Sequence, residues 1–201
     1  MRLSVENLAC RRGGRDVFAG VSFALAAGEA LTIIGRNGSG KSSLLRLVAG
    51  LLLPADGRIT LEGGDSELNL GEQAHYLGHQ EALKPALTVR ENLHFWSRYL
   101  GPAGIAPEAA LTLAGLAELA DLPAAYLSAG QRRRLSLARL AAVKRPIWLL
   151  DEPASALDSS GQARLAGMMH EHLTQGGLIL AAAHGAIGLE RSKELRLGDT
   201  A

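Results

Sequence analysis

The chain has 201 residues, and 47% of them are hydrophobic, which is enough for one large domain with its own core. Its 21 basic residues nearly balance its 20 acidic ones, and a net charge of +1 argues against a protein that wraps nucleic acid. The single cysteine, Cys10, cannot form an internal disulfide, and the first residues do not resemble a signal peptide. The most apolar stretch, 44–54, is too short to span a membrane. We expect a cytoplasmic globular protein that would reach a membrane only through a partner.

The first 80 residues favour strands joined by glycine-rich or charged turns. Strands are predicted at 2–8, 17–25, 30–34, 58–63 and 74–80. A helix over 40–50 follows the third of them, and Pro54 and Gly57 end that region. From Thr88 the pattern is helical, because Thr88 and Glu91 have the spacing of a capping box.

Helices are predicted over 88–100, 107–119 and 130–144. After them a buried strand at 146–151, a helix at 159–174, an apolar strand at 177–183 and a short tail ending in ELRL complete the chain. No internal repeat or linker appears in the sequence. We therefore predict a single α/β domain over 1–201, with a core of 1–80 and 146–201 and a helical insertion at about 81–145.

The segment GRNGSGKS matches the P-loop pattern, and it lies between an apolar strand and a helix as that pattern requires. Its glycines let the backbone curl so that several N–H groups face one anion. Lys41 would reach the β- and γ-phosphates of a nucleotide, and Ser42 could ligate Mg²⁺. A plain strand-to-helix turn is disfavoured, because Lys41 and Ser42 are both in register. The predicted phosphate-binding residues are Gly35, Arg36, Asn37, Gly38, Ser39, Gly40, Lys41, Ser42 and Ser43.

Two acidic residues, Asp151 and Glu152, directly follow the strand predicted at 146–151. Open α/β sheets bind ligands at the carboxyl ends of their strands. Asp151 would hold Mg²⁺, and Glu152 would accept a proton from the water that attacks the γ-phosphate, or orient that water. Read alone, the pair is an ordinary strand end with solvated acids, but the P-loop favours the catalytic interpretation.

The segment LSAGQ is a short loop that leads into a predicted helix, so its amides form an anion site. The loop residues are Leu127, Ser128, Ala129, Gly130 and Gln131. Three arginines, 132–134, follow it, although positive charge is unfavourable at that end of a helix unless an anion lies nearby. Alternatively some of them face water, the interpretation we favour for Arg133. A nucleic-acid patch is disfavoured, since no aromatic residues interleave with these arginines.

Taken together, these motifs resemble the ATP-binding cassette family over about residues 3–197, in family order. Gln80 stands at the Q-loop glutamine, SALD at 155–158 is the D-loop, and His184 is the switch histidine. The resemblance implies an ABC-type nucleotide-binding domain with an antiparallel β subdomain and a helical insertion. It also implies an ATP-dependent head-to-tail dimer, in which the LSAGQ loop of each copy meets the γ-phosphate bound by the other.

From the same resemblance, Gln80 would contact Mg²⁺ or the attacking water, so that the predicted metal ligands are Ser42, Gln80 and Asp151. His184 would contact the γ-phosphate, and Asp158 would bridge the two copies. Each has a simpler interpretation when taken alone: a loop glutamine, a strand-end histidine and an N-cap of the helix at 159–174.

One position departs from the family pattern. Many cassettes stack adenine on an aromatic residue shortly after the first strand, where this chain has Arg12. Stacking a base on an aromatic side chain is worth about 1 to 3 kcal/mol, and a guanidinium replaces only part of that. We therefore expect Arg12 to give the isolated chain modest affinity and weak base discrimination.

A closer resemblance is to the heme exporter ATPases of cytochrome c maturation, carried by YLGHQEALKPALTVRENLHFW, LSAGQRRRLSLARL and LLDEPASALD. It implies a peripheral protein on the cytoplasmic face of the bacterial inner membrane, bound to integral membrane subunits, whose ATP turnover drives release of a heme-loaded periplasmic chaperone. The chain has no C-x-x-C-H motif and no His or Cys cluster, so we expect no direct heme binding. We likewise expect no nucleic acid as partner.

Three alternatives remain at this point. The chain could serve another small-cargo exporter, act on ribosomes or DNA as a soluble cassette, or be a P-loop kinase, although LSAGQ has no purpose in a kinase. The loop at Gln80 and the helix at 88–100 should form the groove where a membrane subunit docks. Phe95 and Trp96 would be the floor of this groove or part of the helical core.

Overall fold

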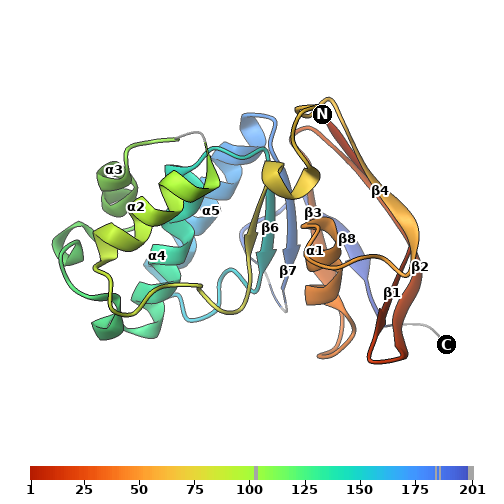
Figure 1. The fold of residues 1–201 in the computed structure, drawn as a ribbon, viewed down its shortest axis with the longest axis horizontal. Coiled ribbons are helices and arrows are strands. Elements are labelled where there is room, and N and C mark those ends of the chain that lie inside the picture. The colour runs from red at the N-terminus through yellow and green to blue at the C-terminus, as the bar shows by residue number, and fades with distance from the viewer. Residues whose placement is uncertain (102–103, 184, 186, 199–201) are drawn as a thin grey trace. The chain divides into compact units, whose positions relative to one another are not determined.

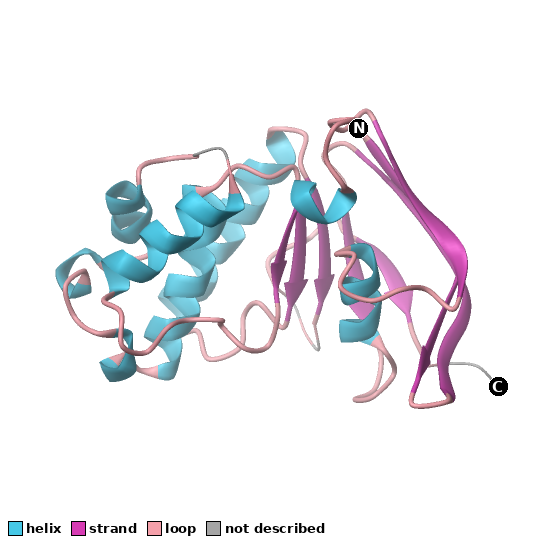
Figure 2. Ribbon diagram, in the orientation of Figure 1, coloured by secondary structure: helices cyan, strands magenta, loops and turns pink. Residues whose placement is uncertain are grey.

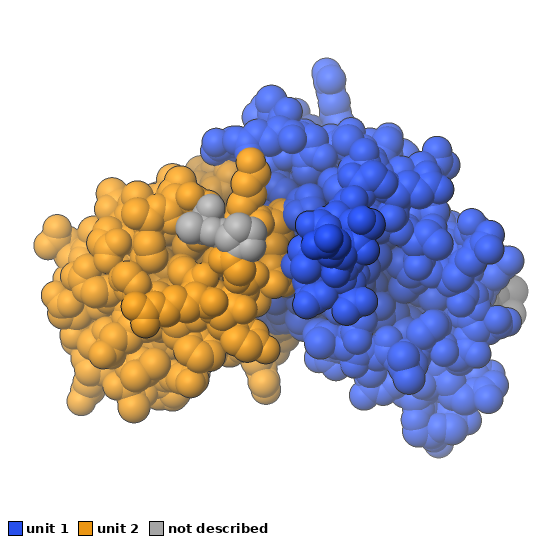
Figure 3. Space-filling model, turned by 45° about the horizontal axis from the view of Figure 1, so that its top comes forward, with its two compact units in different colours: residues 1–78, 146–153, 169–201 blue, residues 79–145, 154–168 orange. Residues whose placement is uncertain are grey.

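The computed structural model describes residues 1–101, 104–183, 185 and 187–198. The chain divides into two compact units, coloured blue and orange in Figure 3. Unit 1 comprises Met1–Gly78, Pro146–Pro153 and Met169–Ala201, and unit 2 comprises His79–Arg145 and Ala154–Met168. The helical insertion predicted at 81–145 lies within unit 2. Unit 2 also contains the SALD motif at 155–158.

Unit 1 contains two sheets, which are drawn in magenta in Figure 2. The first is antiparallel with the order β2-β1-β4, and its strands are β1 (Arg2–Arg12), β2 (Arg15–Ala26) and β4 (Asp56–Glu62). The second is parallel with the order β5-β6-β7-β3-β8. Its strands are β3 (Ala30–Ile34), β5 (Ala74–Leu77), β6 (Ile147–Asp151), β7 (Leu178–Ala182) and β8 (Lys193–Arg196).

Helix α1 (Lys41–Val48) lies between the two sheets of unit 1, as Figure 1 shows. Its leucines join the inward residues of both sheets in one hydrophobic core, including Leu3, Leu8, Ile33, Leu44, Leu45, Leu149 and Leu180. Strands β6 and β7 are buried along their whole length, which explains why their sequences are continuously apolar. A short 3₁₀ helix, η1 (Leu70–Gln73), precedes β5.

The strand order places the functional segments at one edge of the parallel sheet. Strands β3 and β6 flank β7, and all three run in the same direction. The P-loop that follows β3 and the acids that follow β6 therefore emerge at the same carboxyl edge, where open α/β sheets bind ligands.

Unit 2 is helical and has a core of its own, formed by residues such as Val89, Leu93, Leu111, Leu116, Leu127 and Leu135. Its helices are α2 (Val89–Leu100), α3 (Pro107–Leu113), α4 (Ala129–Ala142) and the first part of α5 (Ser159–Thr174). Two 3₁₀ turns, η2 (Ala117–Leu119) and η3 (Ala124–Tyr126), connect α3 to α4. None of the helices in the described part of the chain could cross a membrane, because none is both long and apolar enough.

Most predicted elements are confirmed, and the exceptions have local causes. The capping box at Thr88 is present, with the Glu91 N–H donating to Thr88 Oγ1 at 3.1 Å. The helix predicted over 107–119 is wrong in its second half, because α3 ends at Leu113 and Gly115 adopts a left-handed φ of +66°. The ELRL tail contributes to a further strand, β8, which pairs with β3 at the edge of the sheet.

A stacked pair of rings, buried Trp148 and half-buried His172, joins β6 to the end of α5 within unit 1. The Trp148 and His172 rings stack with centroids 4.0 Å apart and planes 11° apart. Neither Trp148 Nε1 nor His172 Nε2 has a hydrogen-bond partner among the described residues. A side chain at Gly177 would overlap the His172 ring, so glycine is required there. Burial lowers the pKa of His172 to about 4, and the imidazole is therefore neutral at pH 7.

This pair should make the folded state sensitive to acid. Because the folded-state pKa of His172 lies below its unfolded value, the unfolded chain binds the extra proton as pH falls from about 6.5 to about 4. The free energy of unfolding should fall by up to about 3 kcal/mol over that range. Urea unfolding at pH 7 and pH 4.5 measures it, and His172→Phe, which keeps a ring on Trp148, should lose that part of the pH dependence. Equal pH dependence in both proteins would contradict the assignment.

Candidate nucleotide-binding site

The P-loop between β3 and α1 has a backbone that only glycine adopts easily. Gly35, Gly38 and Gly40 have φ values of +149°, +82° and +98°. A Cβ on Gly38 would meet no atom within 4 Å, so the loop is open at that point. At Gly40 a Cβ would lie 2.7 Å from Val17 Cγ1 and 2.8 Å from Phe18 Cδ1, which packs the loop tightly against β2.

Helix α1 begins without a cap. Its N-cap residue is Gly40, no side chain accepts a hydrogen bond from its first turn, and that turn contains no acidic residue. The N–H groups of a first helical turn and the helix dipole together favour an anion. The Lys41 ammonium is buried, and it donates to the Gly35 carbonyl at 2.8 Å and to the Arg36 carbonyl at 3.2 Å. These groups are suited to a phosphate chain, and phosphate binding by the P-loop stays a prediction.

The end of β8 supports the P-loop, which the sequence analysis did not predict. A Cβ on Gly35 would collide with the Leu197 carbonyl, and one on Gly198 would lie 3.0 Å from Ser39 Cβ. Ser39 Oγ is buried and has no hydrogen-bond partner among the described residues. The only hint in the sequence is the glycine at 198, because this contact joins segments about 160 residues apart in the chain.

The hairpin of β1 and β2 carries Arg12 at its tip. Arg12 is exposed, pairs across the hairpin with Arg15, and precedes the turn at Gly13 and Gly14. The same hairpin contributes Val17 to the contact with the P-loop. The Arg12 guanidinium therefore belongs to the hairpin that borders the P-loop. Its contact with the base of a nucleotide stays a prediction.

The two acids lie at the carboxyl end of β6. Asp151 is its last residue and is only 4% exposed. Glu152 has a φ of +49°, and its N–H donates to the Ala182 carbonyl of β7 at 3.0 Å. A left-handed backbone is costly for a residue with a side chain, and such strain is concentrated at functional sites. The left-handed turn at Glu152 ends the extended backbone of β6 directly after Asp151.

Ser42 and Asp151 supply oxygen donors suited to Mg²⁺. Ser42 lies in the first turn of α1, and α1 packs against β6, the strand that ends in Asp151. A hydroxyl and a carboxylate are ligands of the kind that this hard cation prefers. The third predicted ligand, Gln80, is exposed and follows β5 by three residues, in unit 2. His184 lies outside the described residues.

The LSAGQ loop caps α4. The Gln131 N–H donates to Ser128 Oγ at 3.2 Å, and the Ser128 N–H donates to Gln131 Oε1 at 2.7 Å. Gly130 lies close to the neighbouring SALD loop, because a Cβ there would be 2.8 Å from the Ala156 carbonyl oxygen. The structure thus brings the LSAGQ and SALD loops together within unit 2.

The arginines after LSAGQ mainly hold unit 2 together. Arg132 donates to the Leu127 carbonyl at 2.5 Å, and Arg134 donates to the Ala114 and Gly115 carbonyls at 3.3 and 3.2 Å. The expectation that Arg133 faces water is wrong, since Arg133 is only 1% exposed. In α4 it lies one turn before the buried Leu137, on the inward side of the helix.

Asp158 caps the start of α5. Its Oδ1 accepts from the Gly161 N–H at 2.8 Å and from Ser160 Oγ at 3.2 Å. The hydrogen bond from the Gly161 N–H is the main cause that holds the pKa of Asp158 below its usual value, followed by the hydrogen bond from Ser160, with smaller contributions from Arg134 and Arg164. The N-cap interpretation of Asp158 is therefore confirmed, and a bridge to a second copy stays a prediction.

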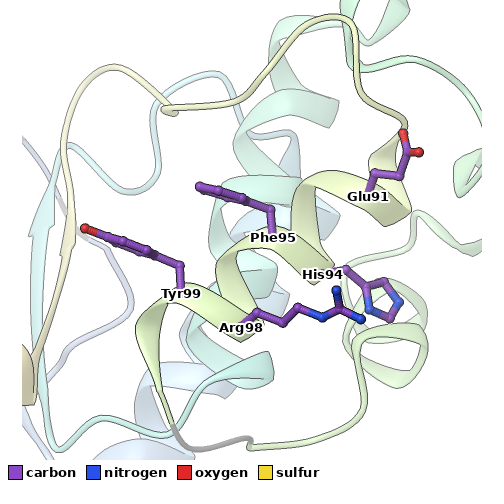
Figure 4. Close-up of a pocket in the computed structure, with 5 residues that line it drawn as sticks. All are labelled: Glu91, His94, Phe95, Arg98 and Tyr99. Carbon is purple, nitrogen blue, oxygen red and sulfur yellow. The ribbon is translucent and has the colours of Figure 1, made fainter.

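A second surface of unit 2 lies along α2. Glu91, His94, Phe95, Arg98 and Tyr99 line a shallow hollow of about 460 Å³, and in Figure 4 Phe95 and Tyr99 point to the same side of the helix. Their rings are stacked with centroids 5.9 Å apart, and they are 36% and 72% exposed. Phe95 is thus a surface residue, as the groove interpretation requires.

Trp96 lies beneath this surface and is half-buried. The Arg139 guanidinium is 4.4 Å from the Trp96 ring centroid. Among the described residues, the hydrophobic core of unit 2 includes neither Phe95 nor Trp96, and their role as the floor of a groove stays a prediction. Burial lowers the pKa of Arg139 to about 10, with a further contribution from Arg133, and Arg139 remains charged at pH 7.

Asn92 is a structural residue that the sequence analysis missed. It is 1% exposed, and its side-chain amide both accepts from and donates to the backbone of the loop between Gln80 and α2. Its Oδ1 accepts from the Lys84 N–H, and its Nδ2 donates to the carbonyls of Lys84, Leu87 and Thr88. A polar residue in the first turn of an amphipathic helix is a weak signal, because most such residues face water.

Replacing Gly40 tests the cradle. Gly40→Ala puts a Cβ against Val17 and Phe18 at a positive φ, so we expect Mg-ATP affinity to fall by at least about tenfold. Gly14→Ala is the matched control, since Gly14 has a φ of +77° but no atom within 4 Å of its Cβ position. Calorimetric titration of both variants gives the affinities. Equal affinities would show that the loop geometry at Gly40 does not matter for binding.

Known proteins share both the sequence and the fold. The model of the ABC transporter family matches residues 18–155. This chain is 59% identical to the cytochrome c biogenesis ATP-binding export protein CcmA of Bradyrhizobium diazoefficiens and 62% identical to that of Nitrobacter winogradskyi. Each alignment covers the full length of both chains.

Solved structures agree with this result. An ATP-binding subunit of an ABC transporter superposes with a TM-score of 0.84 at 25% identity, covering 98% of this chain and 86% of that chain. A dimeric ATP-binding cassette bound to ADP and Pi has a TM-score of 0.81 at 23% identity, covering 98% and 94%, which supports the fold alone. The chain belongs to the ABC transporter family, among the cytochrome c biogenesis ATP-binding export proteins called CcmA.

Proposed function

We propose that the chain is the ATP-hydrolysing subunit of a heme exporter in cytochrome c maturation, and that its ATP turnover drives release of a heme-loaded periplasmic chaperone. The main support for ATP hydrolysis is the uncapped N-terminus of α1 with the buried Lys41. This helix end lies at the sheet edge where Asp151 and Glu152 also emerge. The full-length likeness to CcmA proteins supports the assignment to cytochrome c biogenesis.

The residues of unit 1 bind the nucleotide and prepare the water. The amides of the P-loop and the first turn of α1 bind the phosphates, and Lys41 exchanges its two carbonyl partners for phosphate oxygens. Ser42 and Asp151 hold Mg²⁺, which neutralises charge on the phosphates when it is bound. Glu152 accepts the proton of the attacking water or orients that water. Gln80 contacts Mg²⁺ or the attacking water, and His184 contacts the γ-phosphate.

The residues of unit 2 complete the site of a second copy. Ser128 Oγ already accepts the Gln131 N–H, and its own O–H remains as a donor for the γ-phosphate held by the other copy. The amides around Gly130, at the start of α4, add the field of that helix. Asp158 meets the second copy beside them, so that ATP is enclosed only in a head-to-tail dimer.

The α2 surface is the docking site for the integral membrane subunits. Phe95 and Tyr99 offer exposed aromatic area, and Asn92 fixes the loop between Gln80 and α2. The chain is then a peripheral protein on the cytoplasmic face of the inner membrane. It binds neither heme nor nucleic acid, and closing the dimer over ATP moves the membrane subunits through this surface.

Replacing the proposed catalytic acid tests the hydrolysis step. Glu152→Gln removes the group that takes the proton and leaves the phosphate contacts in place, so hydrolysis should fall by at least about 10²-fold while ATP still binds. Size measurements with Mg-ATP should then show a stable dimer. A variant that hydrolyses ATP at the parent rate would remove Glu152 from this role.

Replacing the exposed aromatics tests the docking surface. Phe95→Ala with Tyr99→Ala removes the stacked pair, and we expect at least about tenfold less of the chain to co-purify with its membrane subunits from detergent-solubilised membranes. Leu113→Ala is the matched control, since Leu113 is also exposed in unit 2 but lies on α3. Co-purification of the parent chain with ribosomes or DNA, in place of membrane proteins, would favour the alternative cassette function.

A further inference from the structure

The two loops that would meet a second copy are in contact within unit 2. Gly130 of the LSAGQ loop approaches the carbonyl of Ala156 so closely that a side chain would overlap it. Ala156 itself has a φ of +60°, a conformation that costs free energy unless the surrounding structure holds it. The SALD loop is therefore held in a specific conformation against the LSAGQ loop.

Two guanidinium groups lie close together in unit 2, on the helices that follow these two loops. Arg134 of α4 and Arg164 of α5 both lie close to Gly115, since a Cβ there would overlap Arg164 Nη1 and lie 3.0 Å from Arg134 Nη1. Arg134, Gly161 and Arg164 also line one small hollow. Two like charges this close repel each other, so the arrangement needs negative charge nearby.

Two sources of negative charge are present. The first is the negative end of the α3 dipole, where the carbonyls of Ala114 and Gly115, directly after the helix, accept hydrogen bonds from Arg134. The second is the Asp158 carboxylate, which accepts a hydrogen bond from the N–H of Gly161, a residue that lines the hollow together with Arg134 and Arg164. Both guanidiniums contribute to the lowered pKa of Asp158, behind the hydrogen bonds from Gly161 and Ser160.

We infer that Arg134 and Arg164 are positioning residues that hold the charged Asp158 loop against the LSAGQ loop, so that the two loops meet a second copy as one preformed surface. This inference rests on the proposed dimer. Arg134 and Arg164 contact neither nucleotide nor water in this scheme, and they act through Asp158. Because a preformed loop loses less conformational entropy on association, their loss should weaken dimerisation while leaving nucleotide binding to a single chain unchanged.

The test uses the full chain with Glu152→Gln, and sedimentation analysis measures the dimer fraction against Mg-ATP concentration. Arg134→Met with Arg164→Met should raise the concentration for half-dimerisation by about tenfold. Nucleotide affinity of the single chain should change by less than about twofold. Arg90→Met is the matched control, because Arg90 is a unit 2 arginine that pairs with Asp121 and Glu108 and is not among the residues that influence Asp158.

A double-mutant cycle separates positioning from a purely structural role. Asp158→Asn removes the charge but keeps an Oδ1 that can cap α5. If the arginines act through Asp158, the paired Met substitutions should add less than about twofold in the Asp158→Asn background. A full, additive tenfold loss in that background would overturn the inference and leave Arg134 as a support for the end of α3.

A second readout uses single chains and does not depend on the dimer. Arg164→Met alone should fold normally, since Arg164 is exposed, and NMR titration of the Asp158 carboxyl should show its pKa raised relative to the parent chain. An unchanged pKa would overturn the link between Arg164 and Asp158. If the Glu152→Gln chain never dimerises with Mg-ATP, the proposed dimer fails, and this titration still decides whether the arginines act on Asp158.

Discussion

The uncapped N-terminus of α1 is the feature on which the rest of the structure depends. Helices α2 and α4 begin with complete capping boxes at Thr88 and Ser128, whereas α1 begins at Gly40 with no side-chain cap. A missing cap costs about 1 kcal/mol of helix stability. The first turn of α1 also lacks an acidic residue, so a phosphate chain would satisfy its free N–H groups. The loop before α1 keeps its shape because β2 and the end of β8 pack directly against its glycines.

In the proposed function, the two units supply different parts of the ATP site. Unit 1 holds the P-loop, Asp151 and Glu152 at one edge of its parallel sheet, and unit 2 holds the LSAGQ and SALD loops side by side. In the proposed dimer, each ATP is enclosed by unit 1 of one copy and unit 2 of the other. Nucleotide binding and dimerisation are then a single linked equilibrium, in which ATP stabilises the closed dimer through its differential contacts.

Helix α4 connects the two surfaces of unit 2 for which a function is proposed. It begins at the cap formed by Ser128, and its last turn carries Arg139 beneath Trp96, which contacts Phe95 edge to face. The buried Arg133 and Arg139 both lie on this helix and keep it anchored in the unit. A close-packed helix transmits displacement along its length, and α4 therefore gives the LSAGQ loop a physical connection to the surface proposed for membrane subunits.

The P-loop motif, the acids after β6, the LSAGQ motif and nearly all of the helices and strands could be predicted from the sequence, because each depends on residues that are near neighbours in the chain. Glycines at fixed offsets, an apolar run and a Thr-x-x-Glu box impose local backbone geometry wherever they occur. Three features could not be predicted in this way: Arg133 is buried, Gly198 supports the P-loop, and Arg134 lies beside Arg164. These features arise from contacts between segments far apart in the sequence, and whether a long charged side chain reaches water or a buried partner depends on which elements pack around it.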